Sequence, residues 1–126
     1  MPRIPTHSLN ELTNVWTKEW AYDTMKIQAL GFDWDSANKH KCCKHGLRPK
    51  EIEDFFQQSG LFVIPDIHHS QSEERYIAYG PSPKGRPMLV AFTFRIQDAE
   101  TLIRPISARH MHKKEAKEYE EKIAEI

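Results

Sequence analysis

Two stretches of this sequence carry basic residues without any acid, and together they hold the side chains needed to cleave a phosphodiester. They are residues 38–50 and residues 101–114, and each contains histidines as well as lysines and arginines. An arginine can hold two phosphate oxygens at once, and a histidine exchanges a proton near neutral pH. Cleaving RNA at its 2′-hydroxyl needs these properties. It needs no metal, because the nucleophile belongs to the substrate.

The first candidate catalytic residues lie where predicted elements end or begin. Lys44 and His45 stand at the end of a predicted helix, and Arg75 opens a predicted strand. Arg109 and His110 lie at a junction between a strand and a helix, where backbone N–H groups also attract an anion. Further basic residues could extend the contact along RNA: Lys39, Lys41, Arg104, Lys113 and Lys114.

Each candidate also has a purely structural interpretation. Lys44 and His45 would stabilise a helix C-terminus in any protein. Arg75 could belong to a row of exposed ion pairs on an edge strand. If Ile77 faces the helices, alternation places Arg75 on that same buried side, unless it lies at the very end of the strand. For Arg109, helix capping is the alternative, although cations at a helix N-terminus are unfavourable without an anion.

Histidines and cysteines of the chain do not form a recognisable metal motif. The pair His68-His69 lies in a polar loop, and adjacent Cys42-Cys43 lack the two-residue gap of a zinc knuckle. A disulfide between neighbouring cysteines is strained, so free thiols are expected. We therefore predict no metal and no cofactor. Trp16, Trp20 and Trp34 could stack on bases, or they could pack in the core.

Composition indicates one small domain. The chain has 126 residues, 39 % of them hydrophobic, and 18 basic residues balance 18 acidic ones. A dedicated nucleic-acid binder usually has a basic excess, so any RNA surface would have to be local. The sequence has no apolar run of membrane-spanning length and no signal-peptide pattern, which predicts a cytoplasmic protein.

The pattern of apolar residues predicts helices first, then strands, then a last helix. Helices are expected over about residues 8–30, 36–45 and 49–59, and strands over 32–34, 61–64, 75–79, 88–96 and 101–108. Pro105 in the last strand indicates a sheet edge or a bulge. The closing helix, about residues 111–126, has an apolar stripe of Ala116, Tyr119, Ile123 and Ile126. This order is typical of an α+β fold whose antiparallel sheet of about four strands has helices packed on it.

Short motifs recur in a fixed order: FDWD at residues 32–35, KHG at 44–46, EERY at 73–76, RPISARH at 104–110 and KEYEE at 117–121. In this order and spacing, the sequence resembles the BrnT family of bacterial type II toxins. The resemblance implies a RelE-like fold over residues 31–126 and leaves residues 1–30 as an N-terminal helical extension. His110 departs from the family, in which a second arginine usually stands at this position.

Two hypotheses about function follow. By resemblance, the chain is a metal-independent endoribonuclease that cleaves RNA and inhibits translation. Its partner would be a BrnA-like antitoxin with a ribbon-helix-helix DNA-binding domain, and the toxin would reach operator DNA only through that antitoxin. The alternative is a non-catalytic module on the same fold that binds RNA or a partner, as the balanced charge and the change at His110 suggest.

Overall fold

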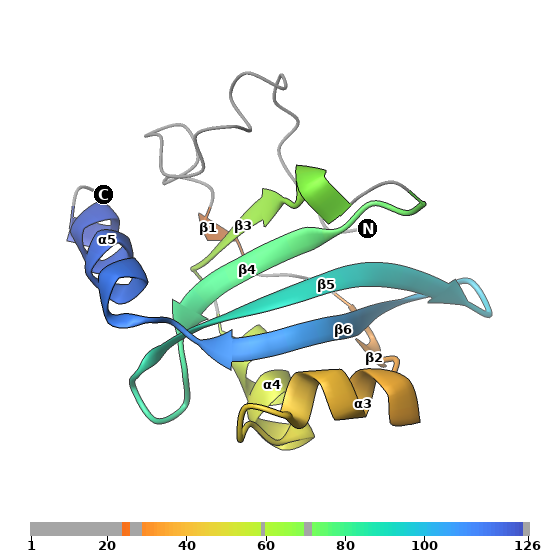
Figure 1. Ribbon diagram of the computed structural model, residues 1–126. Coiled ribbons are helices and arrows are strands. Elements are labelled where there is room, and N and C mark those ends of the chain that lie inside the picture. The colour runs from red at the N-terminus through yellow and green to blue at the C-terminus, as the bar shows by residue number, and fades with distance from the viewer. Residues whose placement is uncertain (1–23, 26–28, 59, 70–71, 125–126) are drawn as a thin grey trace.

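A computed structural model describes residues 24–25, 29–58, 60–69 and 72–124 of the chain (Figure 1). These residues form the predicted α+β fold, with strands in the order β1-β3-β4-β5-β6-β2. The elements are β1 (Thr24–Met25), β2 (Gly31–Phe32), α3 (Ser36–Cys43), α4 (Pro49–Phe56), β3 (Leu61–Pro65), the 3-10 helix η1 (Ile67–His69), β4 (Tyr76–Pro81), β5 (Pro87–Gln97), β6 (Glu100–His110) and α5 (Lys113–Ala124).

The sheet is mixed, which corrects the prediction of an antiparallel sheet of about four strands. Strands β3 to β6 do form the expected antiparallel meander. A short strand is added at each edge: β1 pairs antiparallel with β3, whereas β2 pairs parallel with β6. Both added strands have only two residues. A two-residue strand is too short to show an alternating pattern, so periodicity could not reveal it.

The predicted helix over residues 8–30 is wrong at its C-terminal part. Thr24 and Met25 are extended and pair with Phe62 and Leu61 of β3. Backbone pairing with an open sheet edge here outweighs the local helical pattern. The rest of that predicted helix, including Trp16 and Trp20, lies outside the described residues.

Helices α3 and α4 cover one face of the sheet (Figure 1). Asp35 caps α3 through the backbone N–H of Asn38, and Pro49 begins α4. Phe55 and Phe56 of α4 pack edge to face and join the main core. We call this the core face. Its buried residues are Cys42, Leu47, Ile52, Phe55, Phe56, Leu61, Val63, Ala78, Met88, Val90, Phe92, Ile103 and Ala108.

Helix α5 packs on the opposite face. Tyr119 contacts Phe62 with ring centroids 5.7 Å apart, and Ala116 packs beside them. The predicted stripe of α5 is therefore correct at Ala116 and Tyr119, but Ile123 is 40 % exposed rather than buried. Ile123 does not belong to the cluster that Phe62, Met111 and Tyr119 form, so its side chain is partly open to solvent. We call this face the α5 face.

Strand β6 contains the bulge that Pro105 predicted. Ala91 pairs with Ser107 and Phe92 pairs with Pro105, which leaves Ile106 without an opposite residue on β5. The carbonyl oxygen of Pro105 accepts a hydrogen bond from Nδ2 of Asn38 at 2.8 Å. This bond joins α3 to β6, so the two acid-free basic stretches do lie side by side.

Candidate functional site

Charged residues from three separate motifs meet on the α5 face of the sheet. Nη2 of Arg104 lies 2.9 Å from Asp35, and Nη1 lies 3.4 Å from Asp33. Arg95 reaches Asp33 at 4.0 Å and also forms a short ion pair with Glu73. Glu73 in turn lies 3.8 Å from Arg75. We call this chain of six residues the arginine network: Asp35, Arg104, Asp33, Arg95, Glu73 and Arg75.

Strand alternation places the arginines of this network on the α5 face. Phe94 and Ile103 point into the main core, so their neighbours Arg95 and Arg104 point away from it. On β4, Tyr76 and Ala78 contact the core. The expectation that Ile77 faces the helices is therefore wrong. Arg75 lies on the α5 face with its side chain 31 % exposed, which leaves it accessible to a ligand.

Arg109 lies on the same face, near the other end of β6. It pairs with Leu89 of β5, which packs under α5. Its guanidinium donates to both carboxylate oxygens of Glu115, at 2.8 and 3.0 Å. This bond lowers the pKa of Glu115 to about 2 and raises the pKa of Arg109. Arg109 therefore fixes the start of α5 against the sheet.

His110, the next residue along β6, points to the core face instead. Its partner Met88 is fully buried there. Burial and then the nearby charge of Arg86 lower the pKa of His110, because both disfavour its protonated form. The buried residue Glu51 is near as well, and its carboxylate lies 3.5 Å from Lys84 and 3.3 Å from Arg48. Arg109 and His110 thus belong to different surfaces.

The remaining predicted residues are exposed on the helices and their ends. Lys39 and Lys41 lie on α3, and Lys44 and His45 lie in the turn between α3 and α4. At the start of α5, Lys113 and Lys114 are exposed too. The structure therefore divides the predicted site, with Arg75, Arg104 and Arg109 on the α5 face. The other surface includes Lys44, His45 and His110.

Arg95, Glu73 and Asp33 were not among the residues predicted for the site. Glu73 lies in the EERY motif and Asp33 in the FDWD motif, but acidic side chains do not bind phosphate, so their charge gave no sign of an RNA site. Arg95 lies in an otherwise apolar strand, and its alternation with Phe94 and Ile96 could have indicated an outward-facing charge. Trp34 packs against the core and donates to Glu53 at 3.0 Å, which favours its structural interpretation.

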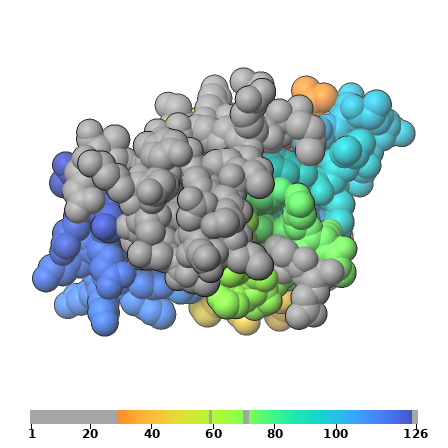
Figure 2. All heavy atoms as spheres, turned by 90° about the horizontal axis from the view of Figure 1, so that it is seen from above, coloured from red at the N-terminus to blue at the C-terminus, as the bar shows by residue number. Residues whose placement is uncertain are grey.

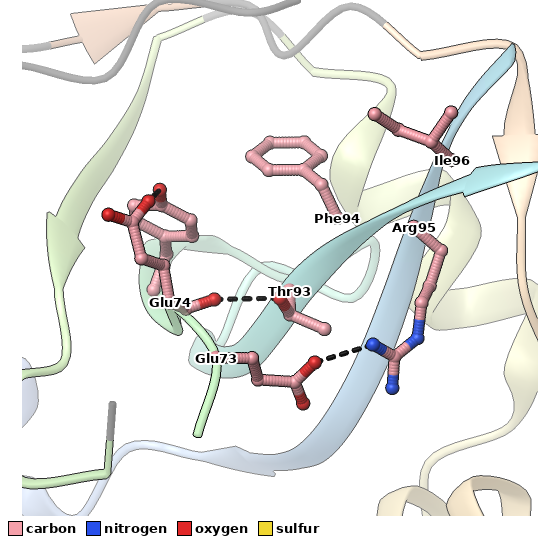
Figure 3. A pocket seen from close by; sticks show the side chains of 7 residues that line it. Glu73, Glu74, Thr93, Phe94, Arg95 and Ile96 are labelled. Carbon is pink, nitrogen blue, oxygen red and sulfur yellow. Dashed lines mark hydrogen bonds and ion pairs between the residues drawn. The ribbon is translucent and has the colours of Figure 1, made fainter. Parts of the chain in front are cut away.

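A pocket of about 330 Å³ opens beside Glu73 and Arg95 (Figure 3). It lies between the segment leading into β4 and the second half of β5. Figure 3 shows the Glu73–Arg95 ion pair and the bond from the Thr93 hydroxyl to the backbone carbonyl of Glu74, 2.7 Å long. The aromatic ring of Phe94 forms another wall. The charged network thus borders a partly apolar hollow.

Neither a metal cluster nor a membrane helix is found in the described part of the chain. There, no group of three or more His, Cys, Asp or Glu residues is placed to hold a metal ion. His69 instead lies 3.0 Å from Asp66. No helix among the described residues is long and apolar enough to span a membrane.

Comparison with known proteins identifies the family. No curated protein matches the sequence. A family model described as "Ribonuclease toxin, BrnT, of type II toxin-antitoxin system" matches residues 34–115, which include the whole network except Asp33. A type II system pairs its toxin with a protein antitoxin. The chain therefore belongs to the BrnT family of ribonuclease toxins.

Proposed function

We propose that this chain is a metal-independent endoribonuclease that cleaves RNA, inhibits translation and is silenced by its antitoxin. The observation that carries the proposal is the arginine network. Residues from the FDWD, EERY and RPISARH motifs, up to 71 positions apart, meet in it on one face of the sheet. RNA cleavage uses a group that accepts the 2′-proton and cations that stabilise the charge on the phosphate, and this cluster offers both.

Glu73 is the general base in this proposal. It lies between Arg75 and Arg95, so its carboxylate can accept the 2′-proton where two guanidinium groups flank the phosphate. The 2′-oxygen then attacks phosphorus as the P–O5′ bond breaks, and a water molecule protonates the departing 5′-oxygen. This produces a 2′,3′-cyclic phosphate and a 5′-hydroxyl. Arg104 extends the cationic path toward Arg109, which acts by positioning α5.

The surface around His110 serves a second role in the proposal. Arg48 and Lys84 pair with Glu51 there, and Arg86 lies near His110, so the positive charges exceed the single negative one. Lys44 and His45 lie in the turn that leads to Arg48. Long RNA would meet this basic surface outside the reaction centre, so these residues would strengthen binding more than they speed cleavage.

The partner and the fold family follow from the resemblance. We propose a RelE-like fold, with residues 1–30 as an extension of a toxin domain over residues 31–126. The antitoxin would be BrnA-like, with a ribbon-helix-helix domain through which the complex reaches operator DNA. The pair would act in the bacterial cytoplasm.

A non-catalytic module that binds RNA or a partner is the second candidate. Its supporting observation is the charge balance of the network, because three arginines face three carboxylates. Such a network could serve only to stabilise the sheet. This candidate predicts salt-sensitive RNA binding without cleavage, and no growth arrest when the chain is expressed alone.

The test is incubation of the purified chain with synthetic single-stranded RNA and with total RNA in EDTA. The variants are Glu73→Gln and Arg109→Ala, and the matched control is Glu118→Gln on the exposed side of α5. We expect cleavage by the wild type and the control, and a loss of about 100-fold or more in Glu73→Gln. Intact RNA with every protein, also after ribosomes are added, would refute the catalytic proposal.

A further inference from the structure

The pocket beside Glu73 and Arg95 exists because β4 is shorter than β5. Strand β4 begins at Tyr76, which pairs with Phe92, whereas β5 continues to Gln97 along β6. The pocket is lined by the two segments that separate here: Glu73, Glu74, Tyr76, Thr93, Phe94, Arg95 and Ile96. Among the described strands, β4 pairs with β5 only as far as Phe92, so one side of β5 stays open beyond it.

The open side of β5 presents backbone hydrogen-bonding groups to the pocket. Asp98 and Ala99 have positive φ and form a two-residue turn, which makes Gln97 and Glu100 a hydrogen-bonded pair. Pairs alternate along an antiparallel ladder, so Phe94 and Ile96 direct their N–H and C=O groups away from β6. Hydrogen bonds on the other side of β6 support this assignment. The carbonyls of their partners Ile103 and Thr101 accept bonds from Asp33 and Leu30.

The walls of the pocket suit a flat aromatic ligand. The rings of Phe94 and Tyr76 have centroids 5.6 Å apart, and Ile96 is 67 % exposed. Unpaired nucleobases are commonly bound by stacking on aromatic rings and by hydrogen bonds to their Watson–Crick edges. A hollow with ring faces and an open strand edge provides both kinds of contact.

Glu74 adds a carboxylate to the lining of the pocket. Its side chain is exposed and is held by the hydroxyl of Tyr76, which donates to Oε2 at 2.8 Å. A carboxylate accepts two parallel hydrogen bonds, and guanine presents two adjacent donors, N1–H and the N2 amino group. Adenine, cytosine and uracil lack this pair of donors. The backbone N–H groups of β5 can meanwhile donate to O6 of guanine.

We infer that this pocket is a nucleobase subsite that prefers guanine. The inference rests on the proposed function, since it places the base next to the phosphate held by Arg95 and Arg75. Glu73, the proposed base catalyst, lines the same pocket, so a guanosine bound there has its ribose near the carboxylate. Cleavage would then occur beside guanosines.

The test measures binding and does not depend on cleavage. The purified ¹⁵N-labelled chain is titrated with 3′-GMP, 3′-AMP, 3′-CMP and 3′-UMP, with inorganic phosphate as the reference ligand. The variants are Glu74→Gln and Phe94→Leu, which keeps an apolar side chain against the core, and the control is Glu118→Gln. We expect 3′-GMP to shift the amide signals of Phe94 and Ile96 and to bind about tenfold tighter than the other nucleotides. Glu74→Gln should remove the preference for 3′-GMP, and Phe94→Leu should weaken the binding of all four nucleotides.

Several outcomes would overturn the inference: equal binding of all four nucleotides, shifts no larger than those caused by phosphate, or unchanged preference in Glu74→Gln. Binding of 3′-GMP by a chain that cleaves no RNA would support the subsite while refuting the catalytic proposal. Cleavage without any preference for guanosine would leave the catalytic proposal standing and would count against the subsite.

Discussion

Arg109 at the end of β6 and Glu115 in the first turn of α5 form a two-point ion pair across the strand-to-helix junction. Glu115 also accepts the backbone N–H of His112 at 2.8 Å, so one carboxylate both caps the helix and binds the sheet. Seen from above, α5 lies at one end of the molecule and the β5–β6 hairpin lies at the other (Figure 2). The pair therefore holds the C-terminal helix at the end of the α5 face away from the pocket.

The Arg109–Glu115 ion pair should make the stability of the fold decrease at acid pH. Folding lowers the pKa of Glu115 from 4.5 to about 2, so its contribution is complete above about pH 4.5 and disappears as the pH falls toward 2. Because the side chain is 37 % exposed, we expect only about 1 kcal/mol. Urea unfolding of the wild type and Glu115→Gln at pH 7 and near pH 2.5 measures it. A difference that persists unchanged at the lower pH would contradict the assignment.

The arginine network and the surface around His110 lie apart. Substitutions in these two places should therefore have different effects on RNA cleavage. Arg75→Gln and Arg95→Gln should reduce RNA cleavage about 100-fold, because they remove the two cations that flank Glu73 in the proposed reaction centre. His45→Gln and His110→Gln should leave the cleavage rate at saturating RNA within about fivefold of the wild type, because they affect the other surface. Single-turnover rates at saturating RNA measure both sets. The reverse order would move the reaction centre to the His110 surface.

The buried side chain of Asn38 should contribute strongly to the stability of the fold. It is 3 % exposed, and its side chain donates to the carbonyls of Asp33 and Pro105 and accepts from the N–H of Asp35. Removing these bonds in Asn38→Ala leaves buried polar groups unsatisfied, which should cost about 2–3 kcal/mol. Chemical denaturation measures it, with the exposed neighbour Lys39→Ala as control. Equal stabilities of the two variants would show that these bonds contribute little.

The adjacent cysteines should differ strongly in reactivity. Cys42 is fully buried, and burial raises its pKa to about 12, so almost no thiolate forms at pH 8. Cys43 is partly exposed. A disulfide-exchange reagent at pH 8 should label one thiol per native chain quickly and the second only on unfolding. Cys43→Ser should remove the fast reaction, and fast labelling of that variant would contradict the burial of Cys42.

The local elements of the fold could be predicted because their signals are local. Asp35 and Pro49 mark helix starts through capping and through the fixed φ of proline, which depend on neighbouring residues only. The long strands β4, β5 and β6 follow from runs of β-favouring residues and turns between them. The bulge at Pro105 follows from its missing N–H. The sequence by itself therefore determined the α+β class, the meander and the motifs that indicate the family.

Only the tertiary structure decided which face of the sheet carries the chemistry. Alternation shows that Arg109 and His110 point in opposite directions, but not which of them meets the helices. That choice depends on where α3 and α4 pack. The prediction that Ile77 faces the helices was wrong for this reason. The pairing of Thr24–Met25 with β3 and the meeting of Asp33 with Arg104 are contacts between distant residues. Such contacts depend on the fold as a whole, so no local pattern in the sequence encodes them.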